Sequence, residues 1–218
     1  LDKRIKGVGA ATHGAALAQV LLGSANAIEQ IIYEGRSLSQ VLDTLDPKLR
    51  PAIQSVTFAA LRSWAHAQKR IQKLVPKKPS KEVDLLLSVS CTLILGQERG
   101  DMQNRYPAHT IVNEAVKAAG SSPKTQFAQG LINAVLRKIA VSSKDEDLVG
   151  QGFGIAFPKW WLEQLQAAYP KEWQGICIEQ GKRPPLVLRI NTNKISLIDY
   201  CALLESKEIS YRRIEHLS

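Results

Sequence analysis

Cysteine and histidine are scarce in this sequence, and their spacing excludes two kinds of small domain. The 218 residues include three cysteines and four histidines. No two cysteines stand at the Cys-x-x-Cys spacing of a zinc ribbon, and no histidine has a second ligand at helical spacing. Three cysteines cannot form a disulfide framework and suit a reducing cytoplasm, where we place the protein. We therefore expect no metal site and no disulfide-linked scaffold.

Long hydrophobic runs are missing as well. No uncharged apolar stretch reaches the ~20 residues that cross a bilayer, so we expect no membrane partner. Residues 1–27 imitate a secretory signal, with an uncharged run, small residues at 25 and 27, and an initial group of bases, Lys3, Arg4 and Lys6. However, the helical spacing of apolar residues continues past this segment. The pattern predicts a packed helix over about 10–34 that ends at Gly35.

Acidic residues are absent from one stretch of the chain. Residues 47–81 contain no Asp or Glu but hold the bases Lys48, Arg50, Arg62, Lys69, Arg70, Lys73, Lys77, Lys78 and Lys81. The net charge of +9 belongs entirely to residues 1–145, because acids and bases are equal in number over 146–218. Such a concentrated field favours a polyanionic partner, either a nucleic acid or an anionic membrane, and of the two we expect a nucleic acid.

Apolar residues make up 44% of the chain, enough for a core, and their periodicity predicts a mainly α protein. Helices are expected at 38–45, 52–75, 83–95 (the most hydrophobic), 107–119 and up to about 140. A glycine-rich linker and a smaller α+β module follow, with helices at 158–168, 170–180 and 196–206 and strands at 186–190 and 209–214. We divide the chain into a helical domain (1–142), a linker (143–156) and the module (157–218). One helix between two short strands cannot bury its faces, so the module looks incomplete.

The helix predicted at 52–75 presents two different faces. On a wheel that turns about 100° per residue, His66, Lys69, Arg70 and Lys73 fall within about 100° of Arg62. Ile53, Val56, Ala60, Trp64, Ala67, Ile71 and Leu74 gather on the opposite side. We interpret the first face as a cationic stripe that contacts a phosphate backbone, with a merely solvated surface as the alternative.

Phe58 lies one helical turn before Arg62 on the basic side. The residue pattern favours packing of this ring beneath a neighbouring helix. The alternative is an exposed ring that stacks on an unpaired base.

Motifs for catalysis are weak. Gly150, Gly152 and Gly154 have the wrong spacing for a dinucleotide-binding loop, and no predicted strand precedes them. Cys91 stands among leucines in a predicted core helix, as a small buried residue would. The residues alone therefore indicate a binding unit rather than an enzyme.

Two motifs together resemble a known family. Arg105-Tyr106-Pro107-Ala108-His109, followed by Ile111-Val112-Asn113-Glu114-Ala115-Val116, is the first motif, and Gly130-Leu131-Ile132-Asn133-Ala134-Val135-Leu136-Arg137 is the second. Both are similar to signatures of the Sun/Fmu (RsmB) family of bacterial 16S rRNA cytosine-C5 methyltransferases. Further similarity lies at 157–162, 169–173 and 183–191, in the module that joins the NusB-like domain of that family to its methyltransferase core.

The resemblance implies a NusB-like helical bundle that binds 16S rRNA, followed by a connecting module. Complete family members continue into a methyltransferase domain that binds S-adenosylmethionine and carries two catalytic cysteines. None of the motifs of that domain occurs in this sequence. We therefore expect no bound cofactor, no catalytic residue and no activity in this chain, and we expect its C-terminal methyltransferase domain to be missing. A ribosomal protein or a second copy of the chain is a further expected partner.

The resemblance and the charge pattern together give the candidate RNA-binding residues: Lys3, Arg4, Lys6, Arg62, Lys69, Arg70, Lys73, Lys77, Lys78, Arg105, Arg183 and Arg189. Asn113 and Asn133 are expected to satisfy buried backbone groups or each other rather than RNA. Three residues of the segment at 183–191 bind RNA, contact the absent domain or make ordinary surface pairs: Arg183, Arg189 and Asn191.

Two other functions remain open at the level of sequence. One is a NusB-type transcription antitermination factor, against which the residues at 157–191 argue. The other is a protein-interaction scaffold whose basic face is incidental, and such a scaffold would bind no RNA.

Overall fold

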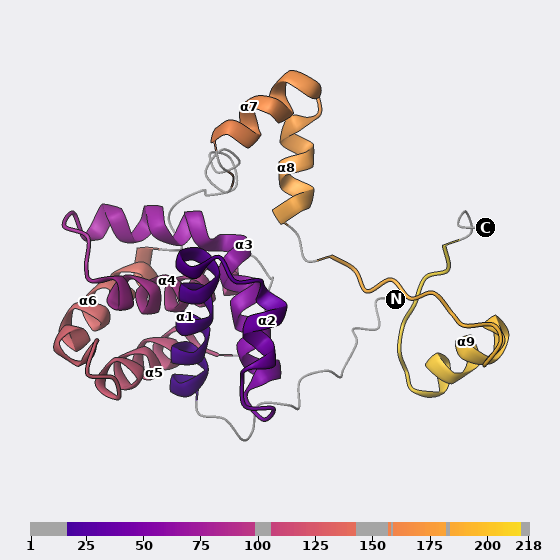
Figure 1. The fold of residues 1–218 in the computed structure, drawn as a ribbon, viewed down its shortest axis with the longest axis horizontal. Coiled ribbons are helices and arrows are strands. Elements are labelled where there is room, and N and C mark those ends of the chain that lie inside the picture. Colours follow the sequence, from indigo (N-terminus) through magenta and orange to yellow (C-terminus); the bar gives the residue numbers. More distant parts are fainter. Residues whose placement is uncertain (1–16, 99–105, 143–156, 158, 182–183, 215–218) are drawn as a thin grey trace. The chain divides into compact units, whose positions relative to one another are not determined.

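The computed structural model describes residues 17–98, 106–142, 157, 159–181 and 184–214 (Figure 1). The chain divides into two units, one within residues 14–183 and one that includes 184–218. The first unit is helical, with α1 (Leu17–Glu34), α2 (Leu38–Asp43), α3 (Arg50–Leu74), α4 (Lys81–Glu98), α5 (Ala108–Gly120), a 3-10 turn η1 (Gln126–Ala128), α6 (Gln129–Ser142), α7 (Lys159–Ala168) and α8 (Trp173–Gly181). The prediction of a mainly α chain is confirmed.

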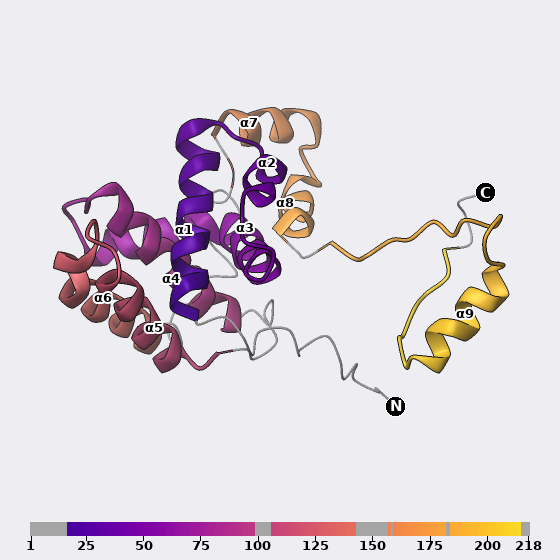
Figure 2. The same ribbon diagram turned by 60° about the horizontal axis from the view of Figure 1, so that its bottom comes forward.

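Helix α4 forms the centre of the α1–α6 bundle. It packs against α1, α3, α5 and α6, and its side chains from Val83 to Leu95 are all buried. Figures 1 and 2 show α2 on one side of α1 and the α5–α6 pair on the other. A helix that is apolar on all sides must be covered on all sides. The expectation that the most hydrophobic segment is the central core helix is therefore confirmed.

The ends of α1 and α2 follow their sequence signals. Gly35 follows α1 with a φ of 67°, a left-handed conformation that costs glycine little because it has no Cβ. Ser37 then caps α2, since its hydroxyl accepts a hydrogen bond from the Gln40 backbone nitrogen. The Gln40 side chain in turn accepts a hydrogen bond from the backbone nitrogen of Ser37 at 3.0 Å. This reciprocal capping box fixes the sharp turn between the two helices.

The predicted helices at 158–168 and 170–180 correspond to α7 and α8. Phe157 stacks on Trp161 of α7, with ring centroids 4.5 Å apart and an interplanar angle of 26°. Leu162 of α7 and Cys177 of α8 are buried, whereas Trp160 remains exposed. The predicted linker at 143–156 lies outside the described residues.

The second unit contains helix α9 (Leu197–Ser206), which begins as predicted after Ser196. The Ser196 hydroxyl accepts a hydrogen bond from the backbone nitrogen of Asp199. The two strands predicted beside this helix are wrong for the residues that the structure describes, since 186–190 and 209–214 run without strand pairing. A strand needs a hydrogen-bonded neighbour, and here the side chain of Leu186 is 84% exposed.

Candidate nucleic-acid interface

The exposed face of α3 carries an aromatic ring and a row of cations. Phe58, Lys69 and Lys73 are exposed and Arg62 is half-buried, and on the helical wheel these four lie within about 60° of one another. The opposite face buries Ile53, Val56, Ala60, Ala67 and Ile71, as the sequence predicts. No Asp or Glu occurs anywhere in α3. We call Phe58, Arg62, Lys69 and Lys73 the α3 face.

The ring of Phe58 is more exposed than the sequence pattern predicts. Its side chain is 41% exposed instead of packed beneath a neighbouring helix. Removal of an exposed phenylalanine ring from water is favourable. The ring is therefore available to a ligand that lies along the α3 face.

The cationic stripe is narrower than the sequence suggests. His66 and Arg70 are buried, at 9% and 6% exposure, and Nη1 of Arg70 donates a hydrogen bond to Oγ of Ser142 at 3.4 Å. Ser142 belongs to α6, so this edge of α3 is covered by another helix. The prediction that His66 and Arg70 share the exposed stripe is wrong, because a helical wheel does not show which flank a neighbour covers.

Two lysines in the turn after α3 differ in their surroundings. Lys77 and Lys78 are both exposed, but Nζ of Lys78 lies 3.7 Å from Oδ2 of the buried Asp84. Gln68 also donates from Nε2 to that carboxylate, at 3.3 Å. Part of the charge of Lys78 therefore balances a buried acid of α4.

Lys81, the last base of the acid-free stretch, is also engaged within the fold. Its Nζ lies 2.5 Å from Oε1 of Glu29 and 5.5 Å from the centre of the Tyr33 ring. The hydrogen bond to Glu29 raises the pKa of Lys81 above its ordinary value. This lysine links α4 to α1 and contributes less than its neighbours to the field around α3.

The other candidate residues are distributed along the chain. Arg189 is exposed in the extended segment of the second unit. Lys3, Arg4, Lys6, Arg105 and Arg183 lie outside the described residues. The structure thus brings together Arg62, Lys69 and Lys73 on one helix face, with Lys77 and Lys78 in the turn that follows.

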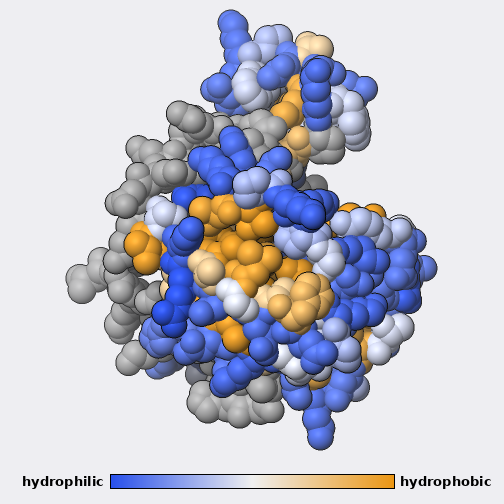
Figure 3. Space-filling view, turned by 90° about the vertical axis from the view of Figure 1, so that its left-hand side faces the viewer, coloured by the Kyte–Doolittle hydropathy of each residue, from blue (hydrophilic) through white to orange (hydrophobic). Residues whose placement is uncertain are grey.

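An apolar surface on η1 and α6 was not predicted. Phe127 is 73% exposed, and Leu131 and Val141 follow it at helical spacing with 39% and 75% exposure. Figure 3 views the side of the helical unit on which α5 and α6 lie and shows an apolar area bordered by hydrophilic residues. Residues 115–142, which include these apolar positions, contain four bases and no acid.

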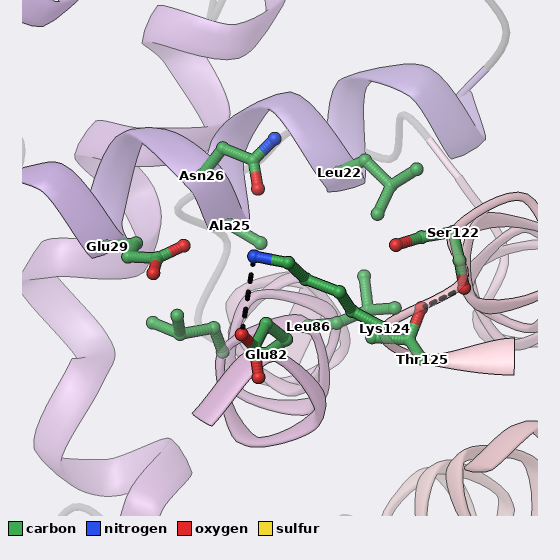
Figure 4. A pocket seen from close by; sticks show the side chains of 10 residues that line it. Leu22, Ala25, Asn26, Glu29, Glu82, Leu86, Ser122, Lys124 and Thr125 are labelled. Carbon is green, nitrogen blue, oxygen red and sulfur yellow. Dashed lines mark hydrogen bonds and ion pairs between the residues drawn. The ribbon is translucent and has the colours of Figure 1, made fainter. Parts of the chain in front are cut away.

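A small pocket lies between α1, the start of α4 and the turn before α6 (Figure 4). Lys124 points across it toward Glu82, and Nζ lies 3.5 Å from Oε1 of that carboxylate. Glu82 stands in the first turn of α4, where a backbone N–H group holds its pKa below the ordinary value of 4.5 and Lys124 adds to the effect. An ion pair therefore crosses the pocket and ties two parts of the bundle together.

Neither a metal cluster nor a membrane span emerges from the described part of the chain. No group of three or more His, Cys, Asp or Glu side chains gathers there in a way that could hold a metal ion. None of the described helices is both long and apolar enough to cross a membrane.

Comparison with known proteins assigns the helical bundle. Residues 15–141 match the profile of the NusB family. The chain belongs to the NusB family. Residues 157–218 match a second profile, the ferredoxin-like domain of RsmF/B-like methyltransferases. The expected combination of a NusB-like domain with an RsmB-type module is thus confirmed.

The relatives of this NusB-family chain are named as rRNA methyltransferases. It is 32% identical to the probable ribosomal RNA small subunit methyltransferase B of Coxiella burnetii, over 87% of this chain and 44% of the relative. It is 32% identical to ribosomal RNA small subunit methyltransferase B of Cronobacter sakazakii, over 84% of this chain and 43% of the relative. It is 30% identical to the protein of the same name from an Enterobacter species, over 86% of this chain and 44% of the relative. The chain spans less than half the length of these relatives.

Residues 108–116 of the first motif lie on α5, and residues 130–137 of the second lie on α6. Glu114 contacts the start of α1, with Oε2 3.3 Å from the Ala18 backbone nitrogen. Asn113 is exposed, and Asn133 is half-buried and accepts a hydrogen bond from Nε of Arg137 at 3.0 Å. The expectation that the two asparagines serve buried backbone groups or each other is therefore wrong in this NusB-family bundle.

Proposed function

We propose that the chain is the RNA-binding region of an S-adenosylmethionine-dependent 16S rRNA (cytosine-C5) methyltransferase. The observation that carries this proposal is the acid-free α3 face within a NusB-family bundle. Its relatives are named small-subunit rRNA methyltransferases, which supports rRNA as the ligand. Ribosomal RNA as a ligand also implies a cytoplasmic location. In this proposal the chain docks rRNA and positions it for a catalytic domain that lies outside this sequence.

Cation spacing on α3 suits a phosphate backbone. Lys69 and Lys73 are separated by one turn, or about 6 Å along the helix axis, and Arg62 precedes Lys69 by about 10 Å. Each contact between a lysine or arginine and a phosphate releases condensed counterions, which favours binding at low salt. The lysines of the following turn extend the same positive field toward the start of α4.

S-adenosylmethionine is assigned to no residue of this chain. Binding sites for such cofactors in open α/β sheets use a glycine-rich turn that follows a strand. The described residues hold no strand, and therefore no such turn. They do not fit the cofactor, and we derive no chemical step that involves it.

The test is the binding of the purified chain to a 16S rRNA transcript at several salt concentrations. We expect the logarithm of the binding constant to fall steeply and linearly with the logarithm of salt concentration. We also expect no methyl transfer when S-adenosylmethionine is added. Binding that is absent or insensitive to salt would contradict the proposal, and methyl transfer by this chain would contradict the assignment of catalysis to another domain.

The NusB-family match favours a second candidate, a transcription antitermination factor that acts with a ribosomal protein. A free-standing factor of this kind would not need residues 143–218. Deletion of that segment would then leave RNA and protein binding unchanged. The methyltransferase proposal predicts instead that the segment is required to join the helical bundle to the catalytic domain.

A further inference from the structure

We propose that the α3 face binds unpaired nucleotides, with Phe58 as the residue on which a base stacks. This inference rests on the proposed RNA-binding function and specifies its ligand. Phe58 is 41% exposed, and Arg62 lies one turn further along the same face. A base stacked on the ring would have its phosphate within reach of that guanidinium, because the two positions are about 6 Å apart along the axis.

The side chains between the cations leave room for a nucleotide. Ala65 lies between Arg62 and Lys69 on the same face. Its side chain is a single methyl group, which projects less from the helix than the side chains on either side. Gln54 and Gln72 border the face at its two ends. Their side-chain amides can donate hydrogen bonds to base edges and accept hydrogen bonds from them. The α3 face thus offers a ring for a base, cations for phosphates, and no acid that would repel them.

Double-stranded RNA fits these features less well. In an A-form helix the faces of the bases are covered by their neighbours, and the deep groove is too narrow for side chains. A phenylalanine ring has no hydrogen-bonding group with which to contact a backbone or a groove edge. Its exposure suits a partner with an open π-face, which every unpaired base has.

Two other kinds of partner fit the α3 face less well. An acidic peptide would attract the cations Lys69 and Lys73, but its charge would give the Phe58 ring no defined partner. A second copy of this chain would place two acid-free cationic faces against each other, which costs free energy. We therefore commit to single-stranded RNA, and preference for another partner is an outcome of the test.

The experiment compares single-stranded RNA with a duplex of the same sequence. The full chain is titrated into each RNA at one fixed salt concentration. The single strand carries 2-aminopurine, whose fluorescence falls when it stacks on an aromatic ring. We expect the wild-type chain to bind the single strand more tightly than the duplex and to quench the probe.

Three variants of one residue test the ring itself. Phe58→Ala and Phe58→Leu are expected to weaken single-strand binding about 5- to 20-fold and to abolish quenching, because leucine keeps the apolar bulk but cannot stack. Phe58→Trp is expected to retain both. Tyr33→Ala removes another exposed aromatic ring of the same unit and is expected to change neither. Thermal melting of each variant checks that the bundle is folded.

The outcomes separate this inference from the proposed function. If the wild-type chain binds RNA with a steep salt dependence but Phe58→Ala and Phe58→Leu bind the single strand as tightly as the wild type, the stacking role is overturned and the RNA-binding function stands. Equal affinity for single strand and duplex would also overturn it. If the wild-type chain binds neither RNA, the proposed function fails, and this inference fails with it.

Discussion

Glu114 of α5 and Ala18 of α1 are joined by a hydrogen bond across 96 positions of sequence. The Ala18 backbone nitrogen donates to Oε2 of Glu114 at 3.3 Å. Ala18 lies in the first turn of α1, where backbone N–H groups lack partners within the helix and a carboxylate is favoured by the helix dipole. Glu114 thus joins two helices, and we expect its role to be structural.

Glu114→Ala should lower the free energy of unfolding by about 1 kcal/mol, the usual cost of losing a cap at a helix N-terminus. Denaturant unfolding measures the difference. Lys117→Ala is the control, because it removes only the exposed ion pair between Lys117 and Glu114 and should cost less than about 0.5 kcal/mol. RNA affinity should be unchanged in Glu114→Ala, and a large loss there would assign Glu114 to the RNA interface instead.

Gly23 marks a close approach of α1 to α3. A Cβ atom at this position would lie 2.5 Å from Cδ1 of Ile53, whose side chain is buried. Gly23→Ala should therefore destabilise the bundle by about 1–3 kcal/mol, in spite of the better helix propensity of alanine. Ile53→Val removes the Cδ1 atom, so the double variant should be less destabilised than the sum of the two single variants. Additive losses would show that the clash is relieved elsewhere.

Glu82 gives the stability of the bundle a pH dependence. Its pKa is lower in the folded chain than the ordinary value of 4.5, mainly through a backbone hydrogen bond at the start of α4 and then through Lys124. The ionised carboxylate therefore stabilises the fold above pH 4.5, and this contribution is lost as the pH falls through the lowered pKa. When unfolding is measured between pH 3 and pH 7, the free energy of unfolding of Glu82→Gln should fall less on acidification than that of the wild-type chain. Equal acid sensitivity would show that other carboxylates dominate.

Lys77 and Lys78 should contribute unequally to RNA binding. The charge of Lys78 is partly balanced by the buried carboxylate of Asp84 at 3.7 Å. Lys77→Ala should therefore reduce the salt slope of binding by about 0.7–0.9, the value for one phosphate contact, and Lys78→Ala by less. Lys78→Ala should also lower stability by more than Lys77→Ala does. Equal slopes and equal stabilities would contradict the role assigned to Asp84.

Local signals in the sequence predicted most of the bundle. Gly35 and Ser37 indicated the turn between α1 and α2, and Ser196 indicated the start of α9. Continuous hydrophobicity identified α4 as the core helix. Each of these signals lies within a single helix or at its ends. This is why they could be read without knowledge of the tertiary structure.

The errors arose where a distant segment decides the outcome. Arg70 is buried because α6 covers one flank of α3, and no wheel contains that information. The segment at 186–190 has strand-forming residues but no strand beside it among the described residues. Phe127 was missed because the local pattern does not show which apolar residues of η1 and α6 the neighbouring helices leave exposed.

The central claim is that the α3 face binds RNA through its cations, and charge reversal tests it most directly. The double variant Lys69→Glu, Lys73→Glu is compared with the matched control Lys194→Glu, Lys207→Glu, which makes the same change of charge at two exposed positions of the second unit. The salt slope of 16S rRNA binding is measured for both. We predict a reduction of about 1.5 or more in the first variant and little change in the control. Equal slopes in the two variants, with the bundle folded in both, would contradict the account.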